Sequence, residues 1–331
     1  MPTSLRFAVG AVVVGVALVG PSTPAGADPA GPTDYDTEIV SVEPATTGIE
    51  LRMIGGDSFL ELTNLAGAEV LVVGYDGEPY LRFDPDGRVL ENERSPSRFL
   101  NDDRFAEGTI PPEADADADP VWRQVASDGS YAWHDHRTHW MNRARPPGAE
   151  PGDQILEAVV PLMVDGAEVE VLVRSFLQAP PSPLPAIGGV VLGAVVAAVV
   201  TVLARRRDRW LALGVGLAAV GALVTGLVAV RSVPAETEPS AAAWLLPLLA
   251  VVAVAGAALL GRRSPILADG LVLLAAAEVG LWSWLRRDAL GAAILPTDAP
   301  FAVERATITF VAVVAVVVGA GRVVSLVRPS P

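Results

Sequence analysis

The chain has 331 residues, and its formal charge of −14 is unevenly distributed. Residues 28–183 contain 30 acidic and 11 arginine side chains, a net charge of about −19, whereas the remainder is slightly basic and mostly apolar. A domain this acidic argues against nucleic-acid binding, because phosphate recognition requires clustered positive charge. The chain has no cysteine, which excludes disulfides, thiolate zinc sites and cysteine-ligated iron–sulfur clusters.

The N-terminus has the features of an export signal. Arg6 precedes an apolar run from Phe7 to Gly20, and Ala25-Gly26-Ala27 has the small-x-small pattern of a cleavage site. The run is short for a membrane span of ~20 residues. We therefore expect a cleaved signal peptide over 1–27, with an uncleaved signal anchor as the alternative. Both place the following domain outside the cytoplasm.

Residues 28–178 predict one extracytoplasmic β domain. Apolar and polar residues alternate over Ile49–Met53 and Phe59–Thr63, and Gly55-Gly56-Asp57 between them predicts a hairpin turn. Further strands are expected beside Asp-Gly turns, at Val70–Tyr75, Tyr80–Phe83, Val89–Glu91, Ile155–Val164 and Ala167–Leu177. Seven or eight short strands predict an all-β fold, either a β-sandwich or a small barrel. The Pro-rich residues 179–183 predict a stiff spacer that holds the domain off the membrane.

The second half of the chain predicts a five-helix transmembrane domain over 184–326 and a tail over 327–331. Five apolar segments are each long enough to cross ~30 Å of hydrocarbon: Leu184–Ala204, Trp210–Val230, Ala242–Gly261, Pro265–Leu285 and Ala306–Val324.

Arginines at the ends of these segments predict the orientation. One side carries Arg205, Arg206, Arg207, Arg209, Arg262, Arg263, Arg322 and Arg328, and the other carries Arg231, Arg286, Arg287 and Arg305. The positive-inside rule assigns the larger group to the cytoplasm. We therefore expect a multi-pass plasma membrane protein with an exported β domain and a cytoplasmic C-terminus.

The fourth segment contains two acidic residues. Asp269 is near its cytoplasmic end and Glu278 is near its centre. A carboxylate inside the bilayer is costly and marks a functional-site hypothesis, either a proton relay or an ion pair with an arginine of a neighbouring helix. The alternative is a protonated Glu278 that is hydrogen-bonded between helices. Trp282 and Trp284 predict an interfacial aromatic belt.

All three histidines lie in the stretch Trp133-His134-Asp135-His136-Arg137-Thr138-His139-Trp140-Met141. Imidazole is the commonest side-chain ligand of transition metals, so His134, His136 and His139 are candidate ligands. If a strand continues from Tyr131 to His136, His134 and His136 share one face, and a turn brings in His139. The Met141 thioether favours copper first and zinc second. The alternatives are a structural or partner-contacting loop and a metal-free catalytic histidine.

The architecture and this motif resemble, in outline, the exported copper-handling β-sandwich proteins of bacteria. That resemblance implies metal handling or sensing. The chain departs from it in two respects, because cleavage exposes Asp28 rather than histidine, and residues 184–331 contain no His, Met or Cys. The W-H-D-H-R-x-H-W-M stretch also resembles actinobacterial proteins that join an exported β domain to several spans, a resemblance that implies no activity.

The remaining motifs do not make an enzyme the default expectation. Carboxylates at every second residue from Glu113 to Asp119 could attract calcium, but without the glycine and terminal glutamate of an EF-hand loop we expect a solvated loop. No nucleophile elbow, phosphate loop or dinucleotide fingerprint is present. Two hypotheses lead: metal handling or sensing through the histidines, and an envelope interaction or scaffold protein whose Trp/His loop, residues 133–141, contacts a protein partner. A metalloenzyme that uses the same three histidines is the third.

Overall fold

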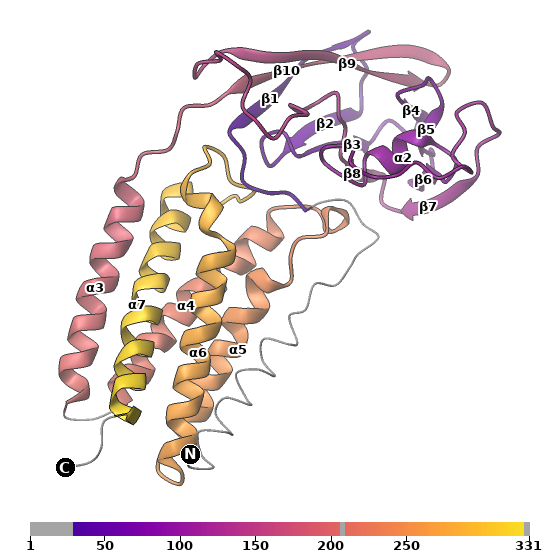
Figure 1. Ribbon diagram of the computed structural model, residues 1–331. Coiled ribbons are helices and arrows are strands. Elements are labelled where there is room, and N and C mark those ends of the chain that lie inside the picture. Colours follow the sequence, from indigo (N-terminus) through magenta and orange to yellow (C-terminus); the bar gives the residue numbers. More distant parts are fainter. Residues whose placement is uncertain (1–28, 206–208, 328–331) are drawn as a thin grey trace.

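The computed structural model describes residues 29–205 and 209–327 (Figure 1). The expected signal peptide over 1–27 and the end of the tail after residue 327 lie outside the described residues. Within them, a part rich in β-strands lies at one end of a bundle of long helices (Figure 1).

The larger sheet has seven antiparallel strands in the order β1-β10-β9-β4-β5-β6-β7. Its longest strands, β9 and β10, form a hairpin at Asp165-Gly166, as the sequence predicts. The strands of this sheet span β1 (Tyr35–Glu43), β4 (Val70–Val73), β5 (Pro79–Phe83), β6 (Val89–Asn92), β7 (Trp122–Ala126), β9 (Gln154–Val164) and β10 (Ala167–Leu177).

The smaller sheet has three antiparallel strands, β2 (Ile49–Ile54), β3 (Phe59–Asn64) and β8 (Ser130–Trp133), with β3 in the middle. The expected hairpin at Gly55-Gly56-Asp57 joins β2 to β3. One hydrophobic core includes residues of both sheets, such as Leu62 of β3 and Phe83 of β5. The described residues thus contain ten strands rather than seven or eight, and β1 and β7 are the two that were not predicted from the sequence. A short helix, α2 (Pro96–Leu100), follows β6.

Five helices within the described residues are long and apolar enough to cross a membrane. They are α3 (Leu184–Ala204), α4 (Arg209–Arg231), α5 (Ala242–Leu260), α6 (Pro265–Leu285) and α7 (Phe301–Val327). These bounds agree with the predicted segments to within a few residues. The 3-10 helix η1 (Ala235–Thr237) lies between α4 and α5, and η2 (Arg287–Leu290) lies between α6 and α7. This composition indicates a multi-pass membrane protein.

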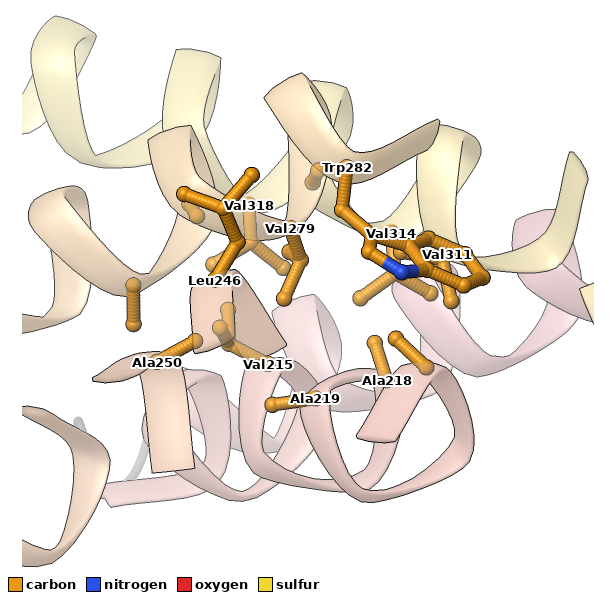
Figure 2. Packing of buried hydrophobic residues seen from close by; sticks show 14 of the residues in the cluster. Val215, Ala218, Ala219, Leu246, Ala250, Val279, Trp282, Val311, Val314 and Val318 are labelled. Atoms are coloured by element: carbon orange, nitrogen blue, oxygen red, sulfur yellow. The ribbon is translucent and has the colours of Figure 1, made fainter. Parts of the chain in front are cut away.

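Small residues allow the helices to approach each other closely. A Cβ atom added at Gly226 of α4 would lie 1.8 Å from the carbonyl oxygen of Ala243 in α5, and one at Gly189 of α3 would lie 2.1 Å from that of Ala306 in α7. The centre of the bundle is filled by aliphatic side chains and by Trp282 (Figure 2). Trp282 is 1% exposed, whereas Trp284 is 64% exposed.

The predicted aromatic belt is therefore wrong for Trp282. Its indole nitrogen donates a hydrogen bond to the carbonyl of Ala243 at 2.8 Å, inside the bundle.

The β part is attached directly to the loops at one end of the bundle. Thr33 and Ile294 exchange two backbone hydrogen bonds of 3.0 and 2.9 Å across an isolated antiparallel bridge. On the neighbouring loop, the Glu236 carboxylate accepts the backbone N–H of Ala132 at 3.1 Å. Because β8 is an edge strand of its sheet, this contact covers part of the exposed sheet edge. The spacer therefore does not hold the β part away from the helices.

Successive helices run in alternating directions, so the arginines separate into two groups as the sequence predicts (Figure 1). Arg231, Arg286, Arg287 and Arg305 lie at the end that contacts the β part. Arg205, Arg209, Arg262, Arg263 and Arg322 lie toward the opposite end, which we call the arginine-rich end.

Candidate functional site

The histidine segment begins where β8 ends. The structure ends this strand at Trp133, so the predicted extension to His136, with His134 and His136 on one strand face, is wrong. The cause is Asp135, whose carboxylate accepts the backbone N–H of Arg137 at 3.1 Å and thereby forms an Asx turn. The backbone N–H of Thr138 then closes on the carbonyl of Asp135 at 2.9 Å.

The Asp135 carboxylate is fully buried and well bonded. The guanidinium of Arg137 donates to it at 2.8 and 2.7 Å, and the indole of Trp133 donates at 3.1 Å. Burial alone would raise the pKa of Asp135, but the charge and hydrogen bonds of Arg137 outweigh burial and lower it. The turn is therefore built around an ionised carboxylate.

Hydrogen bonds connect this turn to distant parts of the β domain. Arg137 also donates to the carbonyl of Val73 after β4, at 3.0 Å. The hydroxyl of Thr37 in β1 donates to the carbonyl of Thr138 at 2.7 Å, and the hydroxyl of Tyr75 accepts the backbone N–H of His136 at 2.8 Å. The histidine segment thus joins β1 and the β4–β5 region.

The three imidazole rings lie together. The ring of His139 makes edge contacts with those of His136 and His134, at centroid distances of 5.4 and 6.3 Å. His134 also stacks on Phe59 at 4.0 Å. The ring nitrogen Nε2 of His136 is 2.9 Å from the carbonyl oxygen of Asp103, and Nε2 of His139 is buried with no hydrogen-bond partner among the described residues.

Burial keeps two of these rings neutral. Burial, together with the nearby positive charge of Arg104, lowers the pKa of His139 from 6.5 to about 3. Burial also lowers the pKa of His136. Neutral imidazole is the form that binds metals and that packs in apolar surroundings.

The arrangement fits a metal centre only in part. No group of three or more His, Cys, Asp or Glu side chains in the described ranges has the geometry of a metal site. The ring contacts bring the imidazoles close, yet Nε2 of His136 is already engaged by Asp103, and Met141 is 36% exposed at the surface. A metal would require the rings to reorient.

A cavity of about 670 Å³ adjoins the histidine segment where the β part meets the helices. We call it the joint cavity. The N-terminal segment 29–35, the 140–145 loop and η2 contribute to its walls, which include Tyr35, Arg104, Phe105, Trp140, Arg145 and Asp288. His134 and His139 are buried in this loop, whereas Trp140 is partly exposed and lines the cavity.

Asp34 holds the joint cavity together. One of its carboxylate oxygens accepts the backbone N–H of Ala293 in the α6–α7 loop at 3.1 Å, and the other accepts Arg145 at 2.9 Å. Two other lining residues also form ion pairs, Arg104 with the buried Asp57 at 2.6 Å and Arg143 with Glu107 at 2.9 Å. This cavity could not be predicted from the sequence, because its walls come from segments more than 250 residues apart.

The acidic residues of α6 have different surroundings. Asp269 forms an ion pair with Arg322 of α7 at 3.3 Å. Glu278 is 9% exposed, and its oxygen Oε2 has no hydrogen-bond partner among the described residues. The carboxylates at 113, 115, 117 and 119 are exposed, as expected for a solvated loop.

Comparisons with known proteins add no assignment. No protein family matches the chain, and neither a curated protein nor a solved structure shows significant similarity to it.

Proposed function

We propose that this chain is a multi-pass protein of the cell envelope whose extracytoplasmic β domain, a sandwich of the two sheets, binds a protein partner at the joint cavity. One observation carries the proposal: Trp140 of the Trp/His loop and Arg145, four residues after the loop, line a cavity next to the helix ends, while His134 and His139 are buried. The arginine bias supports an extracytoplasmic position of the β domain.

The walls of the joint cavity indicate the chemistry of the partner. The Arg143–Glu107 ion pair is largely exposed, as is the Arg145 side of its pair with Asp34. Exposed ion pairs contribute only about 0–1 kcal/mol, so a carboxylate of the partner can replace the internal one at little cost. Tyr35, Phe105 and Trp140 add aromatic surface, the residue type that is enriched at protein interfaces.

The position of the cavity further restricts the kind of protein that can be the partner. Asp288 belongs to η2, directly after α6, so the cavity lies just beyond the end of a candidate span. A membrane protein that exposes a carboxylate beside an apolar side chain next to the bilayer fits this site. The five-helix bundle then anchors the β domain at the level of the membrane surface where the partner exposes these side chains.

Photo-crosslinking in living cells tests this proposal. A photoreactive amino acid in place of Trp140 should give a crosslinked species of discrete mass, and the same group in place of Glu168, on the remote β9–β10 hairpin, should not. The pair Arg143→Gln and Arg145→Gln should reduce the crosslink at unchanged protein level. Equal crosslinks from both positions would contradict a site at the joint cavity.

Metal handling with copper first and zinc second is the second candidate function. The observation in its favour is the buried Nε2 of His139, which lacks a hydrogen-bond partner among the described residues and adjoins the rings of His136 and His134. A modest rotation of His136 away from Asp103 would leave its own Nε2 available. Imidazole ligands suit both metals.

The metal content of the full-length protein tests this second function. After loading with copper or zinc and removal of free metal, mass spectrometry should find one equivalent per chain, and joint substitution His134→Phe and His136→Phe should abolish it. Met141→Leu should weaken retention of copper only. Stoichiometric metal that persists in the double variant would exclude the histidine segment as the site.

A further inference from the structure

A second cavity, of about 600 Å³, lies at the arginine-rich end of the bundle. Its walls come from α4, α5, α6 and α7, and we call it the arginine-end cavity. Most of the side chains that line it are small or aliphatic, among them Ala212, Leu213, Val254, Ala258 and Val272. It shares no lining residue with the joint cavity, so an inference about it is independent of the proposed function.

The polar side chains of this cavity are mostly cationic. Arg209, Arg262 and Arg322 line it together with a single carboxylate, Asp269, among the described residues. Arg322 is 7% exposed and pairs with Asp269 at 3.3 Å, while Arg209 and Arg262 are exposed. The lining therefore has an excess of two positive charges over apolar walls.

The cavity extends along the helices rather than across their ends. Its lining residues run from Val254 of α5 to Gly261, the C-cap residue directly after this helix, seven residues apart. At 1.5 Å rise per residue this is a depth of about 10 Å, or a third of the ~30 Å hydrocarbon core. A ligand that matches both parts has an anionic group at the mouth and an apolar chain below it.

We propose that the arginine-end cavity binds an anionic phospholipid, with its phosphate against Arg209, Arg262 and Arg322 and one acyl chain along the aliphatic walls. Basic pockets between membrane helices are suited to anionic head groups. A free anion would bind the guanidinium groups but would leave the apolar walls of the cavity in contact with water. A zwitterionic lipid would pack its acyl chain against the apolar walls, but it would place the positive charge of its own head group close to the arginines.

Lipid retention by the full-length protein in mild detergent tests this inference. Native mass spectrometry after titration with phosphatidylglycerol should show a bound lipid, and phosphatidylcholine should bind at least tenfold more weakly. Joint substitution Arg209→Gln and Arg262→Gln should weaken phosphatidylglycerol binding by about 10- to 30-fold, since each basic residue near the head groups contributes ~1 kcal/mol. The matched control, Arg231→Gln with Arg287→Gln at the opposite end, should leave binding unchanged.

A second pair of variants tests the apolar wall. Ala258→Phe should fill the cavity and reduce lipid binding, whereas Ala255→Phe, an exposed position of α5 outside the cavity lining, should not. Stabilisation by inorganic phosphate that matches the effect of phosphatidylglycerol would overturn the assignment in favour of an anion site. Equal binding of both lipids, or equal losses in test and control variants, would exclude a specific lipid site here.

Discussion

Asp135 determines the conformation of the histidine segment. Its buried carboxylate ends β8, closes the turn and holds the guanidinium of Arg137. Removing one partner of such a pair leaves an uncompensated charge in the interior, which typically costs about 3–5 kcal/mol. The three imidazole rings are in contact because this turn positions them, independently of what they bind.

The neutral state of His139 predicts a pH dependence of stability. Its pKa is about 3 in the folded protein against 6.5 ordinarily, so the unfolded chain binds the extra proton between these values. The contribution of His139 to the free energy of unfolding should be at its maximum above pH 6.5. It should decrease as the pH falls toward 3, by at most ~1.4 kcal/mol per pH unit. Thermal unfolding of the purified protein between pH 7.5 and 5 measures the slope.

Two variants distinguish the titration of His139 from that of other groups nearby. His139→Phe keeps an aromatic ring but cannot titrate, so its unfolding temperature should depend less on pH. Trp140→Phe changes the neighbouring residue and should retain the original dependence. An unchanged slope in His139→Phe would assign the effect to other groups.

Glu278 distinguishes a bundle that anchors from one that relays protons. Glu278 is buried in α6. Among the described residues, the ion pair made by an acidic residue of this helix is that of Asp269 with Arg322, not one of Glu278. One carboxyl without a second titratable group nearby makes a poor proton path. Glu278→Gln should therefore leave both protein level and cellular phenotype unchanged. Loss of function with normal accumulation in the membrane would support a relay.

At the scale of helices, packing depends on particular glycines rather than on small residues in general. Gly226 and Gly221 both lie in α4, but a Cβ atom at Gly226 meets the backbone of α5 at 1.8 Å, whereas one at Gly221 meets only a methyl group of Thr307 at 3.8 Å. Backbone cannot move aside as a flexible side chain can. The contact at Gly226 therefore sets the distance between α4 and α5.

This difference predicts opposite effects of the same substitution. Gly226→Ala should force α4 and α5 apart and destabilise the protein by about 1–3 kcal/mol. Gly221→Ala should be neutral or stabilising, because alanine is favoured over glycine in a helix by about 1 kcal/mol. Thermal unfolding of both variants in detergent checks the prediction, and equal destabilisation would show that the helices do not pack this way.

The helices were predictable from sequence because each is a continuous apolar run that needs no partner to be recognised. The hairpin strands were predictable for a related reason, since alternation and Asp-Gly turns are local signals. The strand extension to His136 failed because the local propensity of Tyr131–Trp133 was overridden by Asp135, whose turn depends on Arg137. Trp282 was misplaced because its hydrogen-bond partner lies 39 residues away in another helix.

At the scale of the whole molecule, the β part and the loop over 231–241 lie at the same end of the bundle. With the arginine bias, this predicts that reporter fusions at residue 150 and within 231–241 are extracytoplasmic. Fusions within 205–209, at 262–263 and at the C-terminus should be cytoplasmic. An extracytoplasmic C-terminus would contradict five spans, most directly at α7, whose entrance contains Glu304 and Arg305.

The joint between the β part and the helices could not be predicted from sequence. It depends on contacts between Thr33 and Ile294 and between Ala132 and Glu236, and no local pattern marks any of these residues. The joint cavity, which needs Asp34, Arg145 and Asp288 together, was invisible for the same reason. The candidate site therefore shares only its Trp/His loop with the sequence-based hypothesis.

The Thr33–Ile294 bridge has a consequence for biosynthesis. Thr33 leaves the ribosome 261 residues before Ile294, and four of the five helices are synthesised between the two residues. At 5–20 residues per second, synthesis of the intervening chain takes roughly 13–52 s. During that interval the β strands can pair with one another, but Thr33 and Asp34 lack their later partners Ile294 and Ala293. A nascent chain stalled before residue 294 should therefore be cut by protease near residues 29–35, where the completed protein resists.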